Sequence, residues 1–441
     1  MGRDRSFSRE ILDEGGLTES TRKGVLGAVL REDGLRASKH IKRGAFMLRG
    51  TCKILSRGLL LFSLLISLFS AVALTPALAA EPIRIGVVVS ITGWGGFLGA
   101  PMKDAFIAIA EDANRRGGLL GRQIELIIED DTSNPSTAVI ATTKLIRDKR
   151  ASVIVGPTIV DSGMAMIPTC EQEQTPFVVT GPVPNLGKKW VFIIGPGDIR
   201  GAARLLELVV TDLGMKRIAL LHDSTNYGKV GASIYNKEIT RYPGAALIIQ
   251  ERYDNSDTNM VPQLTKIKAA GPDIMILHGT GGLAAVIAKN YKQLGMKVPV
   301  IASHATAVPD FVKLAGPIAE ESGWIMFGLK SNIAESLPAD DPYRKNLYEP
   351  FKKLMKDKYG DSTKINLFHE TAYDGLTAAM EAIKTAGTDN RGAIREALEK
   401  IRLDLFLGPY ECTPEDHQGS KRDYHTVPML IKNGSFVPYK K

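Results

Sequence analysis

From residue 81 onward, short apolar runs alternate with longer segments in which apolar residues recur at helical spacing. The runs are too short for helices, and the one at 151–155 is apolar enough for a strand buried on both faces of a parallel sheet. In the first part of the chain they fall at 83–89, 123–129, 151–155, 177–179 and 190–194. Helical spacing follows the first three of them, at 102–116, at 136–148 and from about 160 through Cys170. This alternation predicts a parallel sheet covered by helices.

A second series of the same kind begins after Gly195-Pro196-Gly197. Its expected strands lie at 217–222, 247–253, 274–278, 300–303 and 323–327. Its expected helices lie at about 200–213, 228–241, 260–270 and 282–294. A chain of 441 residues is too long for one small core. The two similar series therefore predict two α/β lobes with a cleft between them.

The C-terminal part of the chain departs from this alternation. Helical spacing appears at 341–359, 367–386 and 390–400 without strands between the segments. The chain then finishes in two short β segments near 427–432 and 435–437.

The loop after the run at 151–155 combines a break at Gly156-Pro157 with Asp161, Ser162 and Gly163 ahead of the next helix. Polar residues beside the unpaired N–H groups of a helix start, at the carboxyl end of a sheet, are typical of a ligand site. An ordinary loop capped by Asp161 or Ser162 would have the same pattern. The loop alone does not decide between these interpretations.

Residues 58–74 form an uncharged apolar run that follows a basic stretch and precedes small residues up to Ala80. This arrangement is typical of a cleaved signal peptide, which we assign to 47–80. The run also approaches the length of a membrane anchor, which is the alternative. We interpret residues 1–46 as a mis-called or disordered extension, because Met47 would be a better start for an exported chain.

Charge and cysteine content depend on this leader. Residues 1–80 hold 13 of the 56 basic and 7 of the 48 acidic side chains, so their removal lowers the formal net charge from +8 to +2. The remaining chain has no basic footprint for nucleic acid. Cys170 and Cys412 follow the leader and could form one disulfide in an oxidising compartment or remain buried thiols.

At this point the sequence resembles a known family, the type I periplasmic solute-binding proteins of ABC transporters, in the leucine/isoleucine/valine-binding branch. The similarity covers essentially all of 81–441, and the order of its pieces is more specific than any one of them. The matching stretches are IRIGVVVSITGWGGFLG (83–99), NRRGGLLGRQIELIIEDDTSNPSTAV (114–139), VIVGP (153–157), IALLHDSTNYGKVG (218–231), QLGMKVPVIASHA (293–305), LAGPIAEESG (314–323) and AYDG (372–375).

The resemblance implies an α/β fold of two doubly wound parallel-sheet lobes joined by a three-crossing hinge, with the ligand between them. Placed on this chain, lobe 1 comprises 81–197 plus 329–408, and lobe 2 comprises 198–328 plus 409–441. The crossings then fall near 195–198, near Gly328 and near 405–410. The resemblance also implies a periplasmic monomer that captures a small solute without a cofactor and delivers it to a membrane permease and its ATPase.

In that family, a hydroxyl at a helix start and backbone groups at the end of the next strand hold the carboxylate of the ligand. Such groups donate charge-assisted hydrogen bonds to an anion. Here Ser162 lies two positions later than the family spacing, so either the loop is longer or Thr158 replaces the hydroxyl. The second element matches Thr180-Gly181-Pro182-Val183, where Val183 is apolar and Thr180 could equally be an ordinary strand-end residue.

Four further positions are candidate ligand contacts. Tyr227 matches a position where the family often has a tyrosine that faces the ligand from the second lobe. Trp94 and Phe97 lie in the expected first βα loop and could form an apolar wall with Leu98, or simply an aromatic surface turn. Thr280 lies in a glycine-rich loop where amino-acid-binding members have tyrosines.

The largest departure from the family pattern is His304. Amino-acid-binding members carry an acidic residue at this position to pair with the ammonium of the ligand, and a histidine cannot stabilise an ammonium as a carboxylate does. We therefore hypothesise a ligand with a carboxylate and an apolar or aromatic body but no α-ammonium, such as an aromatic or aliphatic organic acid. A true branched-chain amino acid ligand is the alternative, as is a structural role for His304.

Two other classes of protein, a dinucleotide-binding protein and an enzyme, fit the sequence less well. The glycines at 279–284 fit a dinucleotide-binding pattern, but the acidic residue expected about 20 positions later is absent. An enzyme would need a base such as His222, His278 or His304, yet no nucleophile elbow or metal-spaced cluster accompanies them. The prediction is a non-catalytic binding protein, with the ligand-binding partner of a membrane sensor as the other possibility.

Overall fold

The computed structural model describes residues 80–195, 198–279, 281–419 and 425–440. Residues 1–79, which hold the predicted extension and nearly all of the predicted signal peptide, lie outside this range, as does Thr280. No helix of the described ranges is long and apolar enough to span a bilayer. Residues 80–441 form one compact unit that contains two separate sheets of the predicted kind.

The first sheet has five parallel strands in the order β2-β1-β3-β4-β5. Their bounds are β1 Ile83–Val89, β2 Ile124–Asp130, β3 Val153–Gly156, β4 Phe177–Val179 and β5 Val191–Ile193. The helices that follow them are α2 Gly96–Arg115, α3 Pro135–Arg147 and α4 Val160–Gln172. Strand order reverses between β1 and β3, which is the kind of position where doubly wound sheets bind ligands.

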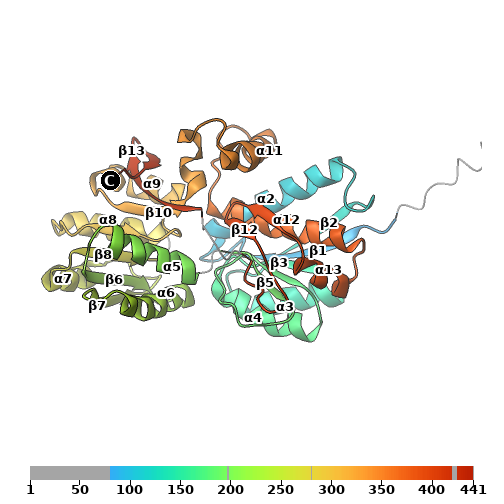
Figure 1. The fold of residues 1–441 in the computed structure, drawn as a ribbon, viewed down its shortest axis with the longest axis horizontal. Coiled ribbons are helices and arrows are strands. Elements are labelled where there is room, and N and C mark those ends of the chain that lie inside the picture. The colour runs from blue at the N-terminus through green and yellow to red at the C-terminus, as the bar shows by residue number, and fades with distance from the viewer. Residues whose placement is uncertain (1–79, 196–197, 280, 420–424, 441) are drawn as a thin grey trace, which may run out of the picture. The chain divides into compact units, whose positions relative to one another are not determined.

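Helices cover both faces of the first sheet, as its buried inner strands β1, β3 and β4 require. One face packs against α3 and α4, and the other against α2 and the C-terminal helices α12 and α13 (Figure 1). The C-terminal helical elements are η4 Arg344–Tyr348, α11 Glu349–Tyr359, α12 Leu367–Ala386 and α13 Arg391–Leu398. Their apolar residues join the core of this first lobe, which explains why they have no strands of their own.

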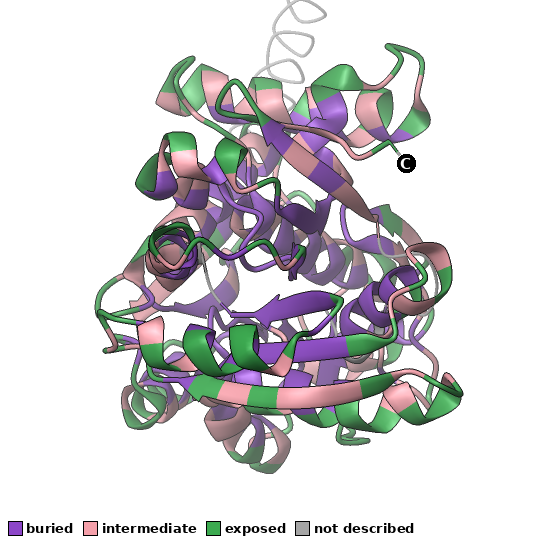
Figure 2. Ribbon diagram, turned by 90° about the vertical axis from the view of Figure 1, so that its left-hand side faces the viewer, coloured by how far each residue is buried: buried purple, intermediate pink, exposed green. Residues whose placement is uncertain are grey.

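The second sheet has seven strands in the order β14-β13-β10-β9-β8-β6-β7. Its parallel strands are β6 Arg217–Asp223, β7 Ala246–Tyr253, β8 Ile274–His278, β9 Val300–Ala302 and β10 Ile325–Leu329. An antiparallel hairpin, β13 Thr426–Lys432 and β14 Ser435–Pro438, extends the β10 edge. The central strands β6, β8, β9 and β10 are buried, whereas β7, β13, β14 and the outward faces of the helices are largely intermediate or exposed (Figure 2).

The helical elements of the second lobe also lie on both faces of its sheet. One core contains residues of α5 and α6, and the other contains residues of α7 to α10. The bounds are α5 Asp198–Glu207, η1 Leu208–Asp212, α6 Asn226–Glu238, η2 Ile239–Arg241, α7 Val261–Ala270, α8 Gly281–Gln293, α9 Pro309–Ala315, α10 Pro317–Glu321 and η3 Lys330–Ser336. The predicted fold of two doubly wound lobes is therefore confirmed.

Residues 409–419 pack against the first lobe, whereas the sequence had placed 409–441 in the second. The short ribbon β11 Leu403–Leu405 with β12 Gly408–Tyr410 leads into this segment. Gly419 N donates to Ile193 O at 2.8 Å, and His417 stacks on Phe192 with a 4.1 Å centroid separation. Because these contacts extend the edge of the first sheet at β5, only the hairpin from β13 onward adds to the second sheet.

Two further local features differ from the sequence expectations or decide between them. Helix α2 begins at Gly96, not near residue 102, because Gly99 lets the first turn pack on Ser90; a Cβ at Gly99 would lie 1.9 Å from Ser90 O. Cys170 and Cys412 do not form a disulfide with each other and are buried in different cores. Burial raises the pKa of the Cys170 thiol, so this thiol is inert at neutral pH.

Candidate functional site

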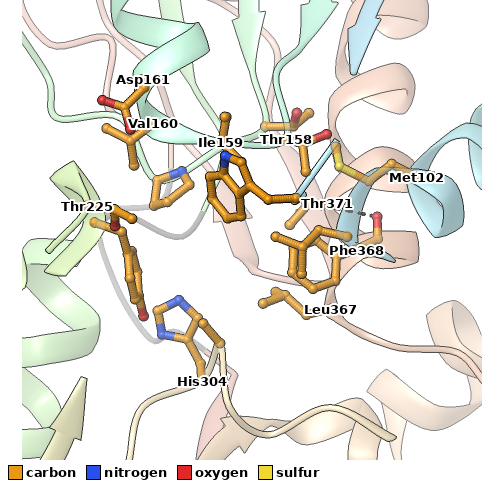
Figure 3. A pocket seen from close by; sticks show the side chains of 16 residues that line it. Met102, Thr158, Ile159, Val160, Asp161, Thr225, His304, Leu367, Phe368 and Thr371 are labelled. Atoms are coloured by element: carbon orange, nitrogen blue, oxygen red, sulfur yellow. Dashed lines mark hydrogen bonds between the residues drawn. The ribbon is translucent and has the colours of Figure 1, made fainter. Parts of the chain in front are cut away.

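A cavity lies where loops that follow strands of both sheets meet. It contains about 620 Å³ of space not filled by protein atoms, part of it open to solvent. The first lobe supplies the loops after β3 and β4 and the starts of α2 and α12, and the second lobe supplies the loops after β6 and β9 (Figure 3). The lining residues are Trp94, Leu98, Met102, Thr158, Ile159, Val160, Asp161, Thr180, Pro182, Thr225, Tyr227, His304, Ala305, Leu367, Phe368 and Thr371.

Two buried threonines on the first-lobe wall have different hydrogen-bonding capacity. The Thr180 hydroxyl donates to Pro157 O at 2.8 Å, so its only hydrogen is already used. The Thr158 hydroxyl instead accepts from Ser90 N at 3.0 Å, which leaves its hydrogen for another acceptor. Of the two, Thr158 is therefore the side-chain donor for a carboxylate in the cavity.

Helix α4 points its uncapped start at the same wall. It begins at Val160 after an extended Ile159, and no side chain caps its first N–H groups. Asp161 and Ser162, expected as possible caps, lie inside the first turn. The helix can start this close to the strand ends because Gly163 lacks a side chain; a Cβ there would lie 2.5 Å from Val183 Cγ2.

Asp161 forms a direct link between the lobes. Its carboxylate lines the cavity and accepts a hydrogen bond from the side-chain amide of Asn226, the first residue of α6. Beside this contact, Val160 packs against Tyr227 and Ala305 of the second lobe. The described lobes are therefore in contact across the cavity, as in a closed state.

The second-lobe wall is built from stacked rings. The Tyr227 ring lies parallel to the His278 ring at a centroid distance of 4.3 Å. The Tyr227 hydroxyl donates to Ser303 Oγ at 3.2 Å. Thr225 caps α6 by accepting from Gly228 N, and Asp223 in turn accepts from Thr225 N at 3.0 Å. These contacts fix the direction in which Tyr227 faces the cavity.

His304 completes this wall and faces the cavity from the segment after β9 (Figure 3). Its ring meets the Tyr227 ring edge-on with a centroid distance of 6.1 Å. Burial lowers the pKa of His304 to about 4. Burial, with the nearby His304 and His222, lowers the pKa of His278 to about 3. Both rings are consequently neutral at pH 7 in this closed, ligand-free arrangement.

A third wall comes from the first turns of α12. Leu367, Phe368 and Thr371 face the cavity, and the preceding Asn366 caps the helix by accepting from Phe368 N at 3.0 Å. The apolar pair at the helix start is therefore held against the cavity by the cap.

The AYDG stretch one turn later anchors this helix to the first lobe. Asp374 accepts from Phe406 N at 2.8 Å and from Leu407 N at 2.9 Å. Gly375 allows the helix to touch the strand end, since a Cβ there would lie 2.3 Å from Thr180 Cγ2. Burial raises the pKa of Asp374 to about 8. The motif therefore positions the ligand-facing part of α12 without itself lining the cavity.

The structure brings together Trp94, Thr158, Thr180, Tyr227 and His304 of the predicted site. Leu98 and Asp161, also named from the sequence, line the cavity as well, whereas the other predicted residues that the structure describes do not. Phe97 is 39% exposed on the first turn of α2. Ser162 and Val183 are buried, and Gly181 packs on Pro157. Thr280 lies outside the described residues.

Sequence reasoning missed eight lining residues, which are Met102, Ile159, Pro182, Thr225, Ala305, Leu367, Phe368 and Thr371. Five of them directly adjoin predicted residues or follow them on the same element. The three on α12 had one available signal, an apolar pair placed between an Asn cap and the AYDG stretch. Nothing in the spacing connects that pair to a cavity almost 200 residues upstream, because only the tertiary fold brings α12 there.

The chemistry of the lining residues favours binding over catalysis. No group of three or more His, Cys, Asp or Glu residues within the described ranges could hold a metal ion. Most of the lining is apolar, with hydroxyls and one imidazole at separate points. Such a cavity buries a small ligand and orients it through a few polar contacts.

Comparisons with known proteins agree with the fold. The chain is 24% identical over 368 residues to the leucine-, isoleucine-, valine-, threonine- and alanine-binding protein of Pseudomonas aeruginosa, covering 81% of this chain and 93% of that one. An extracellular ligand-binding receptor from Rhodopseudomonas palustris superposes with a TM-score of 0.72 at 26% identity, covering 81% and 99% of the two chains. The leucine-binding protein of Thermotoga maritima gives a TM-score of 0.68 at 22% identity, covering 80% and 97%.

The sequence profile of the family described as periplasmic binding protein matches residues 82–427, which is most of the chain. The matched relatives and structures are binding proteins and receptors by name. The chain has two doubly wound lobes with a cavity between them. It belongs to the periplasmic binding protein family, and it is a solute-binding protein and not an enzyme.

Proposed function

We propose that this chain is the extracytoplasmic solute-binding protein of an ABC importer and that it captures a small organic acid between its lobes. The ligand would carry a carboxylate and an apolar or aromatic body. A membrane permease and its ATPase would receive it, and the binding protein would act as a monomer. Hinge closure and removal of water from the cavity would supply the affinity without a cofactor.

The observation that carries this proposal is the chemistry of the second-lobe wall. His304 faces the cavity, and among the residues that the structure describes the second lobe contributes no carboxylate to the lining. A ligand ammonium would therefore lack an acidic partner on that side, whereas a carboxylate can meet Thr158 and the uncapped start of α4. The apolar side chains of the α2 and α12 walls suit a hydrocarbon or aromatic body.

A branched-chain amino acid is the second candidate, and Asp161 is the observation that favours it. This carboxylate lines the cavity from the first lobe and could pair with an ammonium, although it already accepts from Asn226. The names of relatives such as the Pseudomonas aeruginosa protein point the same way. The two candidates thus differ in whether the ligand carries an ammonium.

A matched pair of ligands separates them. Leucine and 4-methylpentanoate differ only in the ammonium, and benzoate adds an aromatic body. A ligand present at a hundred times its dissociation constant stabilises a protein by about 2.7 kcal/mol, which raises the melting temperature of the purified protein measurably. We expect 4-methylpentanoate or benzoate to raise it and leucine to leave it unchanged. The opposite result would transfer the assignment to the amino acid.

Copurification tests the transport role separately. A permease or ATPase recovered with the tagged protein from membranes would support the importer, whereas recovery of a receptor would support the sensor alternative. Turnover of the bound acid would contradict both.

A further inference from the structure

His304 is a buried base for which the described residues provide no hydrogen-bond partner. The residue is 6% exposed, and its ring nitrogens form no hydrogen bond with any residue in the described ranges. Its ring faces the cavity opposite Leu367 (Figure 3). A polar ring at such a position is available to a ligand.

Among the side chains that the structure describes, His304 is the one lining the cavity that could become a cation. Tyr227 of α6 lies edge-on to it, and His278 of β8 lies behind that tyrosine with its pKa lowered by burial. Gly201 of α5 lies against the ring, and the side chains of the preceding residues 198–200 lie outside the described part. Asp161 of α4 lines the same cavity, but no lysine or arginine whose side chain the structure describes does so.

An anion enclosed in this cavity would therefore lack a permanent counter-charge. Neutral donors such as Thr158 and the start of α4 offset part of the cost of desolvating a carboxylate, but Asp161 adds a like charge near that helix start. An imidazolium is the missing partner, because an opposite charge within about 4–6 Å favours the protonated ring. One imidazolium carries the single positive charge that balances one carboxylate.

Resting on the proposed function above, we infer that the protein takes up one proton with each ligand anion, and that His304 holds this proton in the complex. In the open protein His304 meets water and has an ordinary pKa of about 6.5. The carboxylate then raises the pKa of His304 in the complex, so the ring is protonated after binding and mostly neutral before it at pH 7.5. The site accordingly selects monoanions and discriminates against zwitterions.

This inference fixes the sign of the pH dependence. Because the complex holds a proton that the free protein has released, affinity is highest below about pH 6.5. It falls about tenfold per pH unit above that value until the pKa of His304 in the complex is reached. A ligand held by neutral donors alone would show no such decline.

Isothermal titration calorimetry with benzoate and 4-methylpentanoate tests the inference. Titrations at pH 7.5 in phosphate and in Tris, which differ in ionisation enthalpy, give the number of protons taken up. We expect close to one for the native protein. In His304→Lys, whose charge is permanent, we expect binding without proton uptake. The matched control is His222→Gln, since His222 is buried in the same lobe with both ring nitrogens engaged and does not line the cavity.

The outcomes separate the two proposals. Binding of either acid with no proton uptake and an affinity constant between pH 6.5 and 8.5 would overturn the inference and leave organic-acid capture standing. Uptake that persists unchanged in His304→Lys would place the proton on another group and would also overturn it. Binding of leucine and of neither acid would overturn the proposed function and the inference together.

Discussion

The first-lobe and second-lobe walls of the cavity are built by different means. The first-lobe wall uses hydroxyls and backbone groups at strand ends and at the start of α4, such as Thr158 and Thr180. The second-lobe wall uses rings that hold one another, with Tyr227 stacked on His278 and edge-on to His304. The first kind of wall follows from sheet topology, whereas the second depends on side chains that only the folded lobe brings together.

Truncation of the ring stack should produce the largest effect. Tyr227→Ala removes a ring that is 7% exposed and packs against Val160 across the cavity. We expect a loss of about 3–5 kcal/mol in the free energy of unfolding, measured by urea denaturation, together with loss of ligand stabilisation. Tyr227→Phe keeps the stack but loses the bond to Ser303, and should cost only about 1 kcal/mol. Equal losses in both variants would show that stacking contributes little.

The buried titratable groups of the α12 wall and of the second-lobe wall should change the free energy of unfolding with pH in opposite directions. Burial raises the pKa of Glu370, beside the α12 wall, to about 8, and the Asp374 charge adds to this effect. The folded protein then holds protons that the unfolded chain releases, so this contribution to stability declines as pH rises from about 4.5 to 8. Burial, with the nearby His304 and His222, lowers the pKa of His278 behind the second-lobe wall to about 3, so its contribution declines as pH falls from about 6.5 to 3.

Each group changes the free energy of unfolding by about 1.4 kcal/mol per pH unit within its range. Glu370→Gln should therefore flatten the alkaline decline, and His278→Gln the acid decline, in ligand-free urea denaturation at pH 5, 6.5 and 8. A variant that shifts the whole profile without changing its slope would contradict the assignment of that slope to its residue.

A change behind the first-lobe wall should have an intermediate effect. Gly375→Ala places a methyl group within 2.3 Å of Thr180 Cγ2 and 3.1 Å of Val155 Cγ1, so α12 must move away from the strand end. We expect a loss of about 1–3 kcal/mol in thermal stability and weaker ligand binding. Gly392→Ala, on α13 and away from the cavity, is the matched control. Unchanged stability in Gly375→Ala would show that α12 adjusts freely.

The smallest effect should come from the contact between the walls. Asn226→Ala removes the hydrogen bond to Asp161 but leaves both helices intact. Because the contact is partly exposed, we expect ligand affinity to fall by about 1 kcal/mol, or roughly five-fold, in calorimetric titration. Global stability should stay nearly constant, since neither residue belongs to a core. A large loss of stability would mean that this contact holds the lobes together and does not merely favour closure.

The periodicity of the sequence was sufficient for the buried elements. Strand β4 and helix α12 begin and end where the sequence predicts, because each is bounded by clear turn residues or by a cap. The predicted start of α2 was wrong, since Gly99, of a residue type that normally breaks helices, here permits close approach to a strand end.

The candidate site was harder to predict than the fold. Thr158 and Tyr227 follow strands, so the family pattern and sheet topology both point to them. Phe368 comes from a helix late in the chain that packs against the first sheet, and the local spacing of apolar residues does not predict this packing. The same limit applies to residues 409–419, whose attachment to β5 depends on His417 and Gly419 contacts that periodicity cannot reveal.

Different parts of α12 have different roles, and this difference has an evolutionary consequence. Its tip, with Leu367 and Phe368, touches the cavity, while Asp374 and Gly375 further along fix the helix to the first lobe. Substitutions at the tip can therefore alter which solute fits without loosening the anchorage, and the anchorage can persist while the tip drifts. The cavity-facing end of the helix can thus vary while its attachment is kept, which is one route by which a single scaffold can come to bind different solutes.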